Sequence, residues 1–233
     1  RLNDEYLGFL SNIEDDCTSM AALPNATKDG KTMIGGHTQY AYGIGCYNTA
    51  FAVDPPNGNA FWTSTVPGIF MNLKGANEKG LGFRVQFGGN KDSSFGVLSM
   101  FVDVEIMTRA DSVDDAIEII TKGTEQYRQR SGRENVLRSG GIFFTLADQE
   151  SAAVVETTAR YYAVRRPGDF GEKDFIVCAN HARIGHSYDE ENRKTAVSMM
   201  ERCGRSDDGK PGSATRYWAG FWEAMNAAGR IDE

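Results

Sequence analysis

The sequence predicts an α+β fold in which clusters of β-strands alternate with helices. Three observations indicate it. Residues 46–87 are rich in β-branched and aromatic side chains between turn residues, residues 99–129 have helical periodicity, and residues 141–180 return to a period of two. Helical patterns then follow the second strand cluster. This order permits two antiparallel sheets packed between helical layers.

The N-terminal part of the chain predicts a helix followed by a hairpin. In residues 1–16 the apolar side chains fall on one face at helical spacing, and an acidic run ends the segment. Residues 18–23 and 32–37 read as short strands, and the turn between them is rich in Asn, Asp and Gly. This hairpin would place Cys17 at the start of its first strand, at a sheet edge.

The remaining elements follow from the same two periodicities. A capping box with Asp in place of Glu, at residues 112–115, opens the second of the central helices. The expected strands are 48–54, 60–66, 68–73, 82–87, 141–148, 152–157, 161–165 and 175–180. The expected helices are 99–110, 112–129, 189–203 and 213–228.

Composition predicts one globular domain and argues against several classes of partner. The chain has 233 residues, of which 40% are hydrophobic, enough for a full core. Its net charge of -7 argues against a nucleic-acid partner, because phosphate binding needs a basic face. No apolar run approaches the ~20 residues of a membrane span, and no glycine-rich phosphate loop supports a nucleotide cofactor. The three histidines, His37, His181 and His186, lack metal-ligand spacing, so we expect no metal.

Cys17 is the strongest candidate for a catalytic residue. Cysteine is the most nucleophilic of the ordinary side chains at neutral pH, but it needs a base that holds it as a thiolate. Cleavage of the bond between Asp16 and Cys17 would supply that base, because the new α-amino group has a pKa near ~8. The alternative is a buried structural thiol, a common role of free cysteines.

Four patterns stand in a fixed order along the chain. They are Cys-Thr-Ser at 17–19 with Thr-Lys-Asp-Gly-Lys at 27–31, Asn-Glu-Lys-Gly-Leu at 77–81, Cys-Ala-Asn-His at 178–181, and Ser-Ala-Thr-Arg at 213–216. Together they resemble the N-terminal nucleophile (Ntn) amide hydrolases, in the branch that holds penicillin acyl-coenzyme A acyltransferase, conjugated bile acid hydrolase and the phospholipase B-like proteins. The resemblance implies a four-layer αββα Ntn-hydrolase sandwich of two antiparallel sheets.

The resemblance also implies roles for particular residues. Asn180 matches an asparagine that stabilises the oxyanion, and Arg216 matches an active-site arginine. Gln86 falls on a strand where relatives place a polar residue near the site. Apart from the resemblance, His181 directly follows Asn180 and would support it. The alternative without a catalytic role is that Asn180 is an ordinary asparagine at a strand end and that Arg216 is a surface arginine.

The return strand of the hairpin departs from the pattern of the acyltransferase and bile acid hydrolase branches. Those branches end it in Gly-x-Asn-x-Asp, whereas this chain has His37 at the Asn and Gln39 at the Asp position. A neutral amide can hydrogen-bond the nucleophile's amine but cannot stabilise its protonated form by charge. Penicillin or bile acid specificity is therefore not carried over.

The sequence as a whole predicts a self-processing cysteine amidohydrolase or acyltransferase that acts on linear non-peptide amides through an acyl-enzyme at Cys17. Residues 1–16 would be a propeptide end or small-subunit segment. Residues 17–233 would be the Ntn-hydrolase domain, with C-terminal strands missing or supplied elsewhere. Two alternatives stay open: a phospholipase B-like lipid esterase, and a non-catalytic binding protein that keeps the fold.

If the protein is an enzyme, we expect its partner to be a small-molecule amide or acyl substrate. A homo-oligomer and a retained propeptide subunit are both compatible with the sequence. The four cysteines do not fix the compartment. A leader removed before Arg1 would be consistent with a secreted, periplasmic or lysosome-like location.

Overall fold

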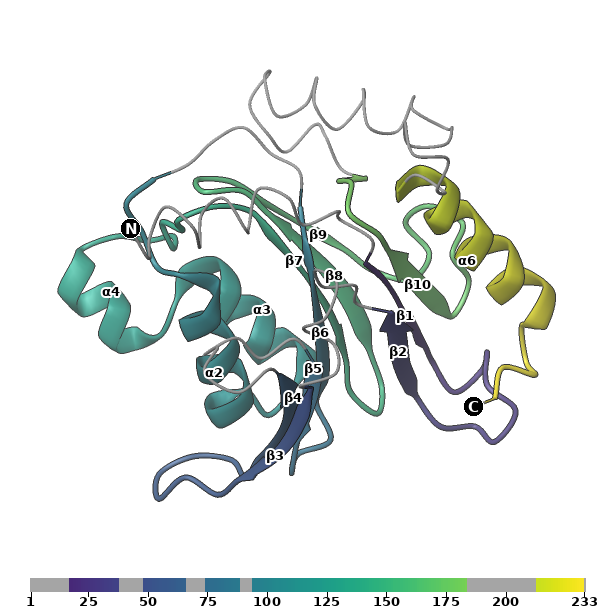
Figure 1. Ribbon diagram of the computed structural model, residues 1–233, viewed down its shortest axis with the longest axis horizontal. Coiled ribbons are helices and arrows are strands. Elements are labelled where there is room, and N and C mark those ends of the chain that lie inside the picture. The colour runs from purple at the N-terminus through teal and green to yellow at the C-terminus, as the bar shows by residue number, and fades with distance from the viewer. Residues whose placement is uncertain (1–16, 38–47, 66–73, 89–93, 184–212, 233) are drawn as a thin grey trace.

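The computed structural model describes residues 17–37, 48–65, 74–88, 94–183 and 213–232. In this part of the chain, two antiparallel sheets lie against each other, with helices outside both (Figure 1). A three-stranded sheet has the order β10-β1-β2, and a seven-stranded sheet runs in sequence order from β3 to β9. The layers are therefore helix, sheet, sheet and helix.

The strands agree closely with the periodicity of the sequence. The three-stranded sheet consists of β1 (Thr18–Ala22), β2 (Met33–His37) and β10 (Phe175–Cys178). The seven-stranded sheet consists of β3 (Thr49–Val53), β4 (Phe61–Thr65), β5 (Lys74–Asn77), β6 (Gly82–Phe87), β7 (Ile142–Ala147), β8 (Ala152–Thr157) and β9 (Tyr162–Arg165). Strand β5 was not predicted, and the strand expected at 68–73 lies outside the described residues.

Helices cover the outer face of each sheet (Figure 1). Helices α2 (Ser99–Arg109), α3 (Val113–Lys122) and α4 (Glu125–Ser131) lie on the side of the seven-stranded sheet, and α6 (Ser213–Ala227) packs on β10 and β1. The expected capping box is present, since the Ser112 side chain accepts from the Asp115 N–H. The helices expected at 1–16 and 189–203 lie outside the described residues.

The single helix predicted for residues 112–129 is wrong. Gly123 takes a positive φ of 74° and ends α3, and the Thr124 side chain then caps α4 by accepting from the Tyr127 N–H. Glycine adopts a positive φ without the penalty that a Cβ brings. Gly123 is therefore a signal for the end of one helix, and Thr124 is a signal for the start of the next. The hydrophobic periodicity continues across both residues, so it predicted a single helix.

Three hydrophobic clusters fill the three spaces between the layers. One joins the seven-stranded sheet to α2 and α3, and includes Phe83, Ile106 and Ile120. A second lies between the two sheets and is made largely of alanines and small aliphatic residues around Phe143. The third joins the three-stranded sheet to α6 through Phe175 and Tyr217, among others. The thin middle cluster lets polar side chains of the two sheets reach each other.

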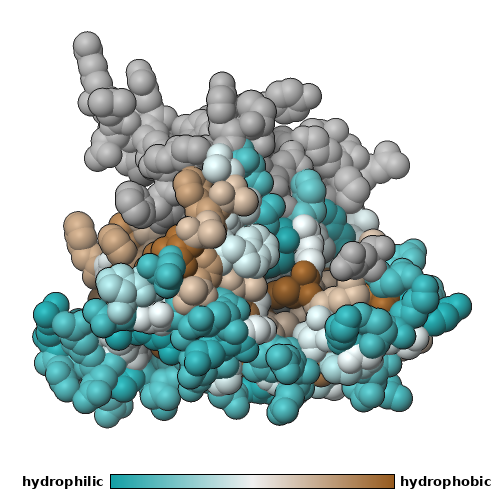
Figure 2. Space-filling model, turned by 90° about the horizontal axis from the view of Figure 1, so that it is seen from below, coloured by the Kyte–Doolittle hydropathy of each residue, from teal (hydrophilic) through white to brown (hydrophobic). Residues whose placement is uncertain are grey.

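The three-stranded sheet covers only part of the seven-stranded one. Contacts between the sheets join β1, β2 and β10 to β6, β7 and β8, and Trp62 on β4, which lies on the same face of the larger sheet, remains exposed. Seen from below, hydrophobic side chains are visible among hydrophilic ones (Figure 2). None of the helices in the described ranges is long and apolar enough to span a lipid bilayer.

Candidate active site

The start of β1 and the end of β10 bring Cys17 and Asn180 together. The two strands pair antiparallel, with Ser19 opposite Cys178, so the residues just before Ser19 and just after Cys178 face each other. The Cys17 backbone N–H donates to Asn180 Oδ1 at 2.8 Å. Both residues are buried, and Cys17 is only 2% exposed. The atom that cleavage would turn into the α-amine is therefore already held by the Asn180 side chain.

Arg216 contacts the same amide oxygen from the first turn of α6. Its Nη2 donates to Asn180 Oδ1 at 2.7 Å, and its Nε donates to Thr18 Oγ1 at 3.3 Å. A hydrogen bond from an ionised donor is stronger than one between neutral groups. Arg216 therefore fixes the Asn180 oxygen beside the Cys17 nitrogen and ties α6 to the start of β1.

The other polar atoms of Asn180 connect it to two further elements. Its Nδ2 donates to the Phe87 carbonyl oxygen at 2.9 Å, across the space between the sheets. Its backbone N–H donates to Ser213 Oγ at 2.8 Å, and His181 Nδ1 lies 2.8 Å from the same hydroxyl. Asn180 is thus anchored by β1, β6 and α6 at once, and these contacts fix its orientation.

Behind the nucleophile, a buried polar network joins the two sheets. Gln86 Nε2 donates to Ser19 Oγ at 2.6 Å, and the same hydroxyl lies 2.6 Å from Thr145 Oγ1. All three side chains are buried. Because Ser19 is two residues after Cys17 on β1, this network positions the strand that carries the nucleophile against β6 and β7. Gln86 therefore lies near the site, and its side chain acts there through its hydrogen bond to Ser19.

Sequence reasoning missed Arg84, a buried cation close to Cys17. Arg84 precedes Gln86 by two residues on β6, so both side chains are on the face that looks towards β1. Burial lowers the pKa of Arg84, and electrostatic attraction to Cys17 opposes that shift. The attraction is reciprocal, so Arg84 favours the thiolate form of Cys17. Side chains alternate between the two faces of a strand, so the position of Arg84 two residues before Gln86 was the signal in the sequence that could have placed it at the site.

The remaining site residues expected from the sequence are placed less centrally or not described. His37 ends β2 opposite Thr18 and is exposed. Asp16 and Gln39 lie outside the described residues. Within the ranges that the structure describes, no group of three or more His, Cys, Asp or Glu side chains is arranged to hold a metal ion.

Burial lowers the pKa of His181 to about 4, with the charges of Arg183, Arg165 and Arg216 acting in the same direction. The ordinary value is 6.5, so between pH 6.5 and pH 4 the unfolded chain binds a proton at this residue that the folded chain does not. We therefore expect the free energy of unfolding to fall as the pH falls through this range, by up to about 1.4 kcal/mol per pH unit from this residue.

Urea unfolding at pH 7.5 and pH 4.5 tests this expectation. His181→Gln keeps a partner for Ser213 but cannot take up the proton, so the variant should lose less stability than the parent between the two pH values. Equal losses in both proteins would contradict the assignment.

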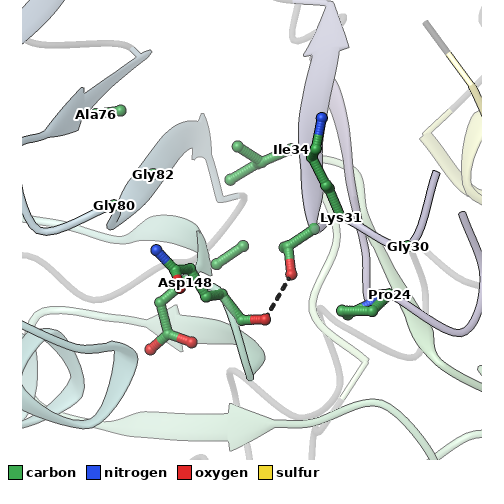
Figure 3. A pocket seen from close by; sticks show the side chains of 11 residues that line it. Pro24, Gly30, Lys31, Ile34, Ala76, Gly80, Gly82 and Asp148 are labelled. Carbon is green, nitrogen blue, oxygen red and sulfur yellow. Dashed lines mark hydrogen bonds between the residues drawn. The ribbon is translucent and has the colours of Figure 1, made fainter.

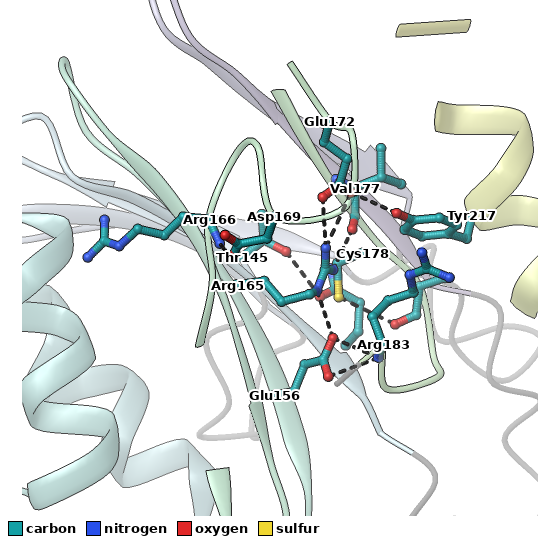
Figure 4. Close-up of polar contacts among 12 residues, drawn as sticks. Thr145, Glu156, Arg165, Arg166, Asp169, Glu172, Val177, Cys178, Arg183 and Tyr217 are labelled. Carbon is teal, nitrogen blue, oxygen red and sulfur yellow. Dashed lines mark hydrogen bonds and ion pairs between the residues drawn. The ribbon is translucent and has the colours of Figure 1, made fainter. Parts of the chain in front are cut away.

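A cluster of buried charges lies beside the site, between β8, β9 and β10 (Figure 4). Arg165 Nε donates to Glu156 at 2.8 Å, its Nη1 donates to Glu172 at 3.1 Å, and its Nη2 donates to the Val177 carbonyl oxygen at 2.7 Å. Tyr217 on α6 donates its hydroxyl to Glu172 at 2.9 Å. Burial would lower the pKa of Arg165, but Glu156 and Glu172 outweigh it and raise the pKa.

A pocket of about 520 Å³ opens at the turns that join β1 to β2 and β7 to β8 (Figure 3). Lys31, Ile34, Gly82 and Asp148 are among the residues that line it. Thr32 Oγ1 bridges the two turns by donating to the Gln149 carbonyl oxygen at 3.1 Å. None of the candidate catalytic residues lines this pocket, and we assign it no role in the reaction.

Solved structures with a similar fold are Ntn cysteine hydrolases. The Caenorhabditis elegans ortholog of N-acylethanolamine-hydrolyzing acid amidase superposes with a TM-score of 0.54 at 12% identity, over 90% of this chain and 85% of that one. A mutant of conjugated bile acid hydrolase from Clostridium perfringens gives 0.56 at 14% identity, over 93% and 75%. Penicillin V acylase from Agrobacterium tumefaciens gives 0.51 at 11% identity, over 93% and 67%. These likenesses confirm the predicted Ntn sandwich of two sheets.

The chain belongs to the acyl-coenzyme A:6-aminopenicillanic acid acyl-transferase family, because the model of that family matches residues 27–225. Membership identifies it as an enzyme of the Ntn amidase or acyltransferase type. None of the curated proteins compared matches its sequence.

Proposed function

We propose that this enzyme is a self-processing cysteine amidohydrolase that cleaves linear non-peptide amides through an acyl-enzyme at Cys17. The observation that carries the proposal is the hydrogen bond from the Cys17 nitrogen to Asn180 Oδ1. In a precursor this bond fixes the peptide nitrogen that follows Asp16. In the processed enzyme it would fix the α-amine at the same place, within reach of its own thiol.

The reaction then follows from the groups around Cys17. The α-amine takes the proton of the Cys17 thiol, and the thiolate, favoured by Arg84, attacks the carbonyl carbon of the amide. The α-ammonium then gives that proton to the leaving amine. Asn180 has a second N–H besides the one that Phe87 accepts, and it would donate this N–H to the oxyanion. Collapse of the tetrahedral intermediate breaks the C–N bond and leaves a thioester at Cys17. Water, or an acceptor amine in the transfer reaction, then releases the acyl group.

The arrangement also supports a role for Arg216 that is distinct from substrate contact. Its guanidinium donates to the oxygen of Asn180, the same atom that accepts from the Cys17 N–H. By holding that oxygen, Arg216 would orient both the α-amine and the amide N–H that faces the oxyanion. We therefore assign it a positioning role.

Amine release from a matched panel tests the function. The chain is expressed with residues 1–16, its intact mass is measured, and it is then offered an N-acylethanolamine, the ester of the same acid and a short peptide. N-acylethanolamine is a suitable first amide because a structural neighbour is named for hydrolysing it. We expect a mass that corresponds to cleavage before Cys17, and amide turnover faster than peptide turnover.

Two results would contradict the proposal. Faster turnover of the ester than of the matched amide would favour a lipid esterase. An uncleaved chain without turnover of any member of the panel would favour a binding protein that has kept the fold.

A further inference from the structure

Strand β3 lies at the edge of the seven-stranded sheet and is exposed along its whole length. Among the strands that the structure describes, it pairs with β4 alone. All five of its residues, from Thr49 to Val53, are exposed. A strand at the edge of a sheet presents N–H and C=O groups with which another strand can pair.

This edge lacks the features by which most proteins keep an edge strand from pairing with another molecule. Those features include charged side chains, prolines and bulges. Residues 49–53 read Thr-Ala-Phe-Ala-Val, with neither a charge nor a proline. The ladder to β4 is regular, with one residue opposite one residue from Thr49 to Val53, so the strand has no bulge there. The edge is therefore open to a second strand.

The apolar side chains of β3 are on the helix-covered face of the sheet. Val53 is the partner of Phe61 on β4, and Phe61 packs in the cluster between this sheet and its helices. Side chains two residues apart on a strand share a face, so Phe51 is on that face as well. Both Phe51 and Val53 are nevertheless exposed, because the helices do not reach over the edge.

Helix α2 adds exposed hydrophobic side chains on the same side. Phe101, Val104 and Thr108 fall on one stripe of the helix, since residues three and four apart are neighbours on its surface. The Thr108 end of the stripe lies against the loop that joins β3 to β4. There the Asn59 N–H donates to the Thr108 carbonyl oxygen at 2.8 Å, and a Cβ at Gly58 would lie 3.1 Å from Thr108 Cβ. Phe101 and Val104 are exposed, so the apolar surface continues from β3 onto α2.

The sequence of β3 is complementary to itself in antiparallel pairing. If two copies pair about Phe51, each Ala50 faces an Ala52, and the two Phe51 side chains face each other on the two-fold axis. Asp54, the first charge after the strand, then faces Asn48. No like charges are opposed, which matters in a chain with a net charge of -7. Facing aromatic rings attract each other beyond the area that they bury.

We propose that β3 is the dimer interface of this enzyme, and that two copies pair antiparallel about Phe51 to join their seven-stranded sheets into one continuous sheet. Such a contact is isologous and closes after two copies, because each copy uses its β3 edge. Phe51, Val53, Phe101 and Val104 of both copies would form a shared apolar surface on the helix-covered face. The inference goes beyond the proposed chemistry, since neither β3 nor α2 carries a candidate catalytic residue.

Sedimentation equilibrium over a range of protein concentrations tests the interface. We expect the parent chain to have the mass of two copies, and Phe51→Lys to have the mass of one, because two lysines would face each other on the axis. The matched control is Trp222→Lys, which places the same charge at an exposed aromatic residue of α6 and should remain a dimer. Circular dichroism checks that both variants keep the fold, as substitutions of exposed side chains should.

Disulfide formation tests the register of the pairing. The background carries Cys46→Ser and Cys203→Ser. In it Phe51→Cys should oxidise to a covalent dimer, because facing residues have Cβ atoms about 4.5–5.5 Å apart. Val53→Cys alone should not, because the two copies of residue 53 would be offset by about 13 Å along the strands. A mixture of Val53→Cys with Thr49→Cys should give a mixed covalent dimer.

Four results would overturn the proposal. They are a parent that is monomeric at every concentration, a dimer that Phe51→Lys leaves intact, equal dissociation of Phe51→Lys and Trp222→Lys, and a covalent dimer from Val53→Cys alone. The first two would place no contact between copies at β3. The third would show a general effect of charge, and the fourth would rule out pairing about Phe51. Each result is read from the mass of the protein, so it is independent of whether the enzyme cleaves amides.

Discussion

Cys17→Ala is expected to abolish both chain cleavage and amide turnover while leaving the fold intact. The substitution removes the only atom to which the acyl group would be attached, and it keeps the backbone N–H that Asn180 accepts. Loss of a catalytic nucleophile lowers turnover by roughly 10³-fold or more in enzymes of known mechanism. Intact mass measures the cleavage, and amine release measures the turnover.

Cys178→Ala is the matched control for this variant. Cys178 is also a buried cysteine of the three-stranded sheet, but burial raises its pKa to about 12, so it is a thiol and not a thiolate at neutral pH. We expect this variant to cleave itself and to turn over amides like the parent. If Cys17→Ala retains cleavage, or if both variants lose activity equally, the nucleophile has been misassigned.

Arg165→Met is expected to lower the free energy of unfolding by about 3–5 kcal/mol, because it leaves two buried carboxylates without their shared cation. Glu156 and Glu172 are both fully buried and both bonded to this guanidinium. Arg165 also binds the Val177 carbonyl oxygen, so its loss would loosen β10, which leads to Asn180. Urea unfolding gives the change in free energy.

The neighbouring Arg166 provides the control. It pairs with Asp114 at the surface, and exposed pairs contribute little, about 0–1 kcal/mol. Arg166→Met should therefore unfold almost like the parent. A similar loss in both variants, or a stable Arg165→Met, would show that the buried cluster does not hold the sheets together.

Local signals were sufficient for most of the fold. The hairpin of β1 and β2 follows from short apolar runs around a turn rich in Asn and Gly, and the capping box at Ser112 is a pattern of adjacent residues. The predicted elements were wrong or incomplete where a local signal was weak, or where a second signal in the same residues pointed to another structure. Gly123 interrupts a helix whose hydrophobic period continues across it, and β5 is too short and too poor in β-branched residues to stand out.

The site depends more on tertiary structure. Cys17, Asn180 and Arg216 were candidates because of the motifs around them, and the pairing of β1 with β10 and the packing of α6 bring them together. Arg84 was not a candidate, because its charge comes near Cys17 only when β6 packs against β1 in the folded chain. The partners of Arg165 could not be predicted either, since they come from three separate segments that meet only in the folded chain.

Trapping the acyl-enzyme tests the central claim most directly. The processed enzyme is mixed with an N-acylethanolamine, quenched in acid within the first turnover and digested, and the peptide masses are measured. We predict that the peptide beginning at Cys17 gains the mass of the acyl group, and that the adduct is lost on treatment with a nucleophilic amine, as a thioester should be. Amide turnover with no adduct on that peptide, or with the adduct on another residue, would contradict it.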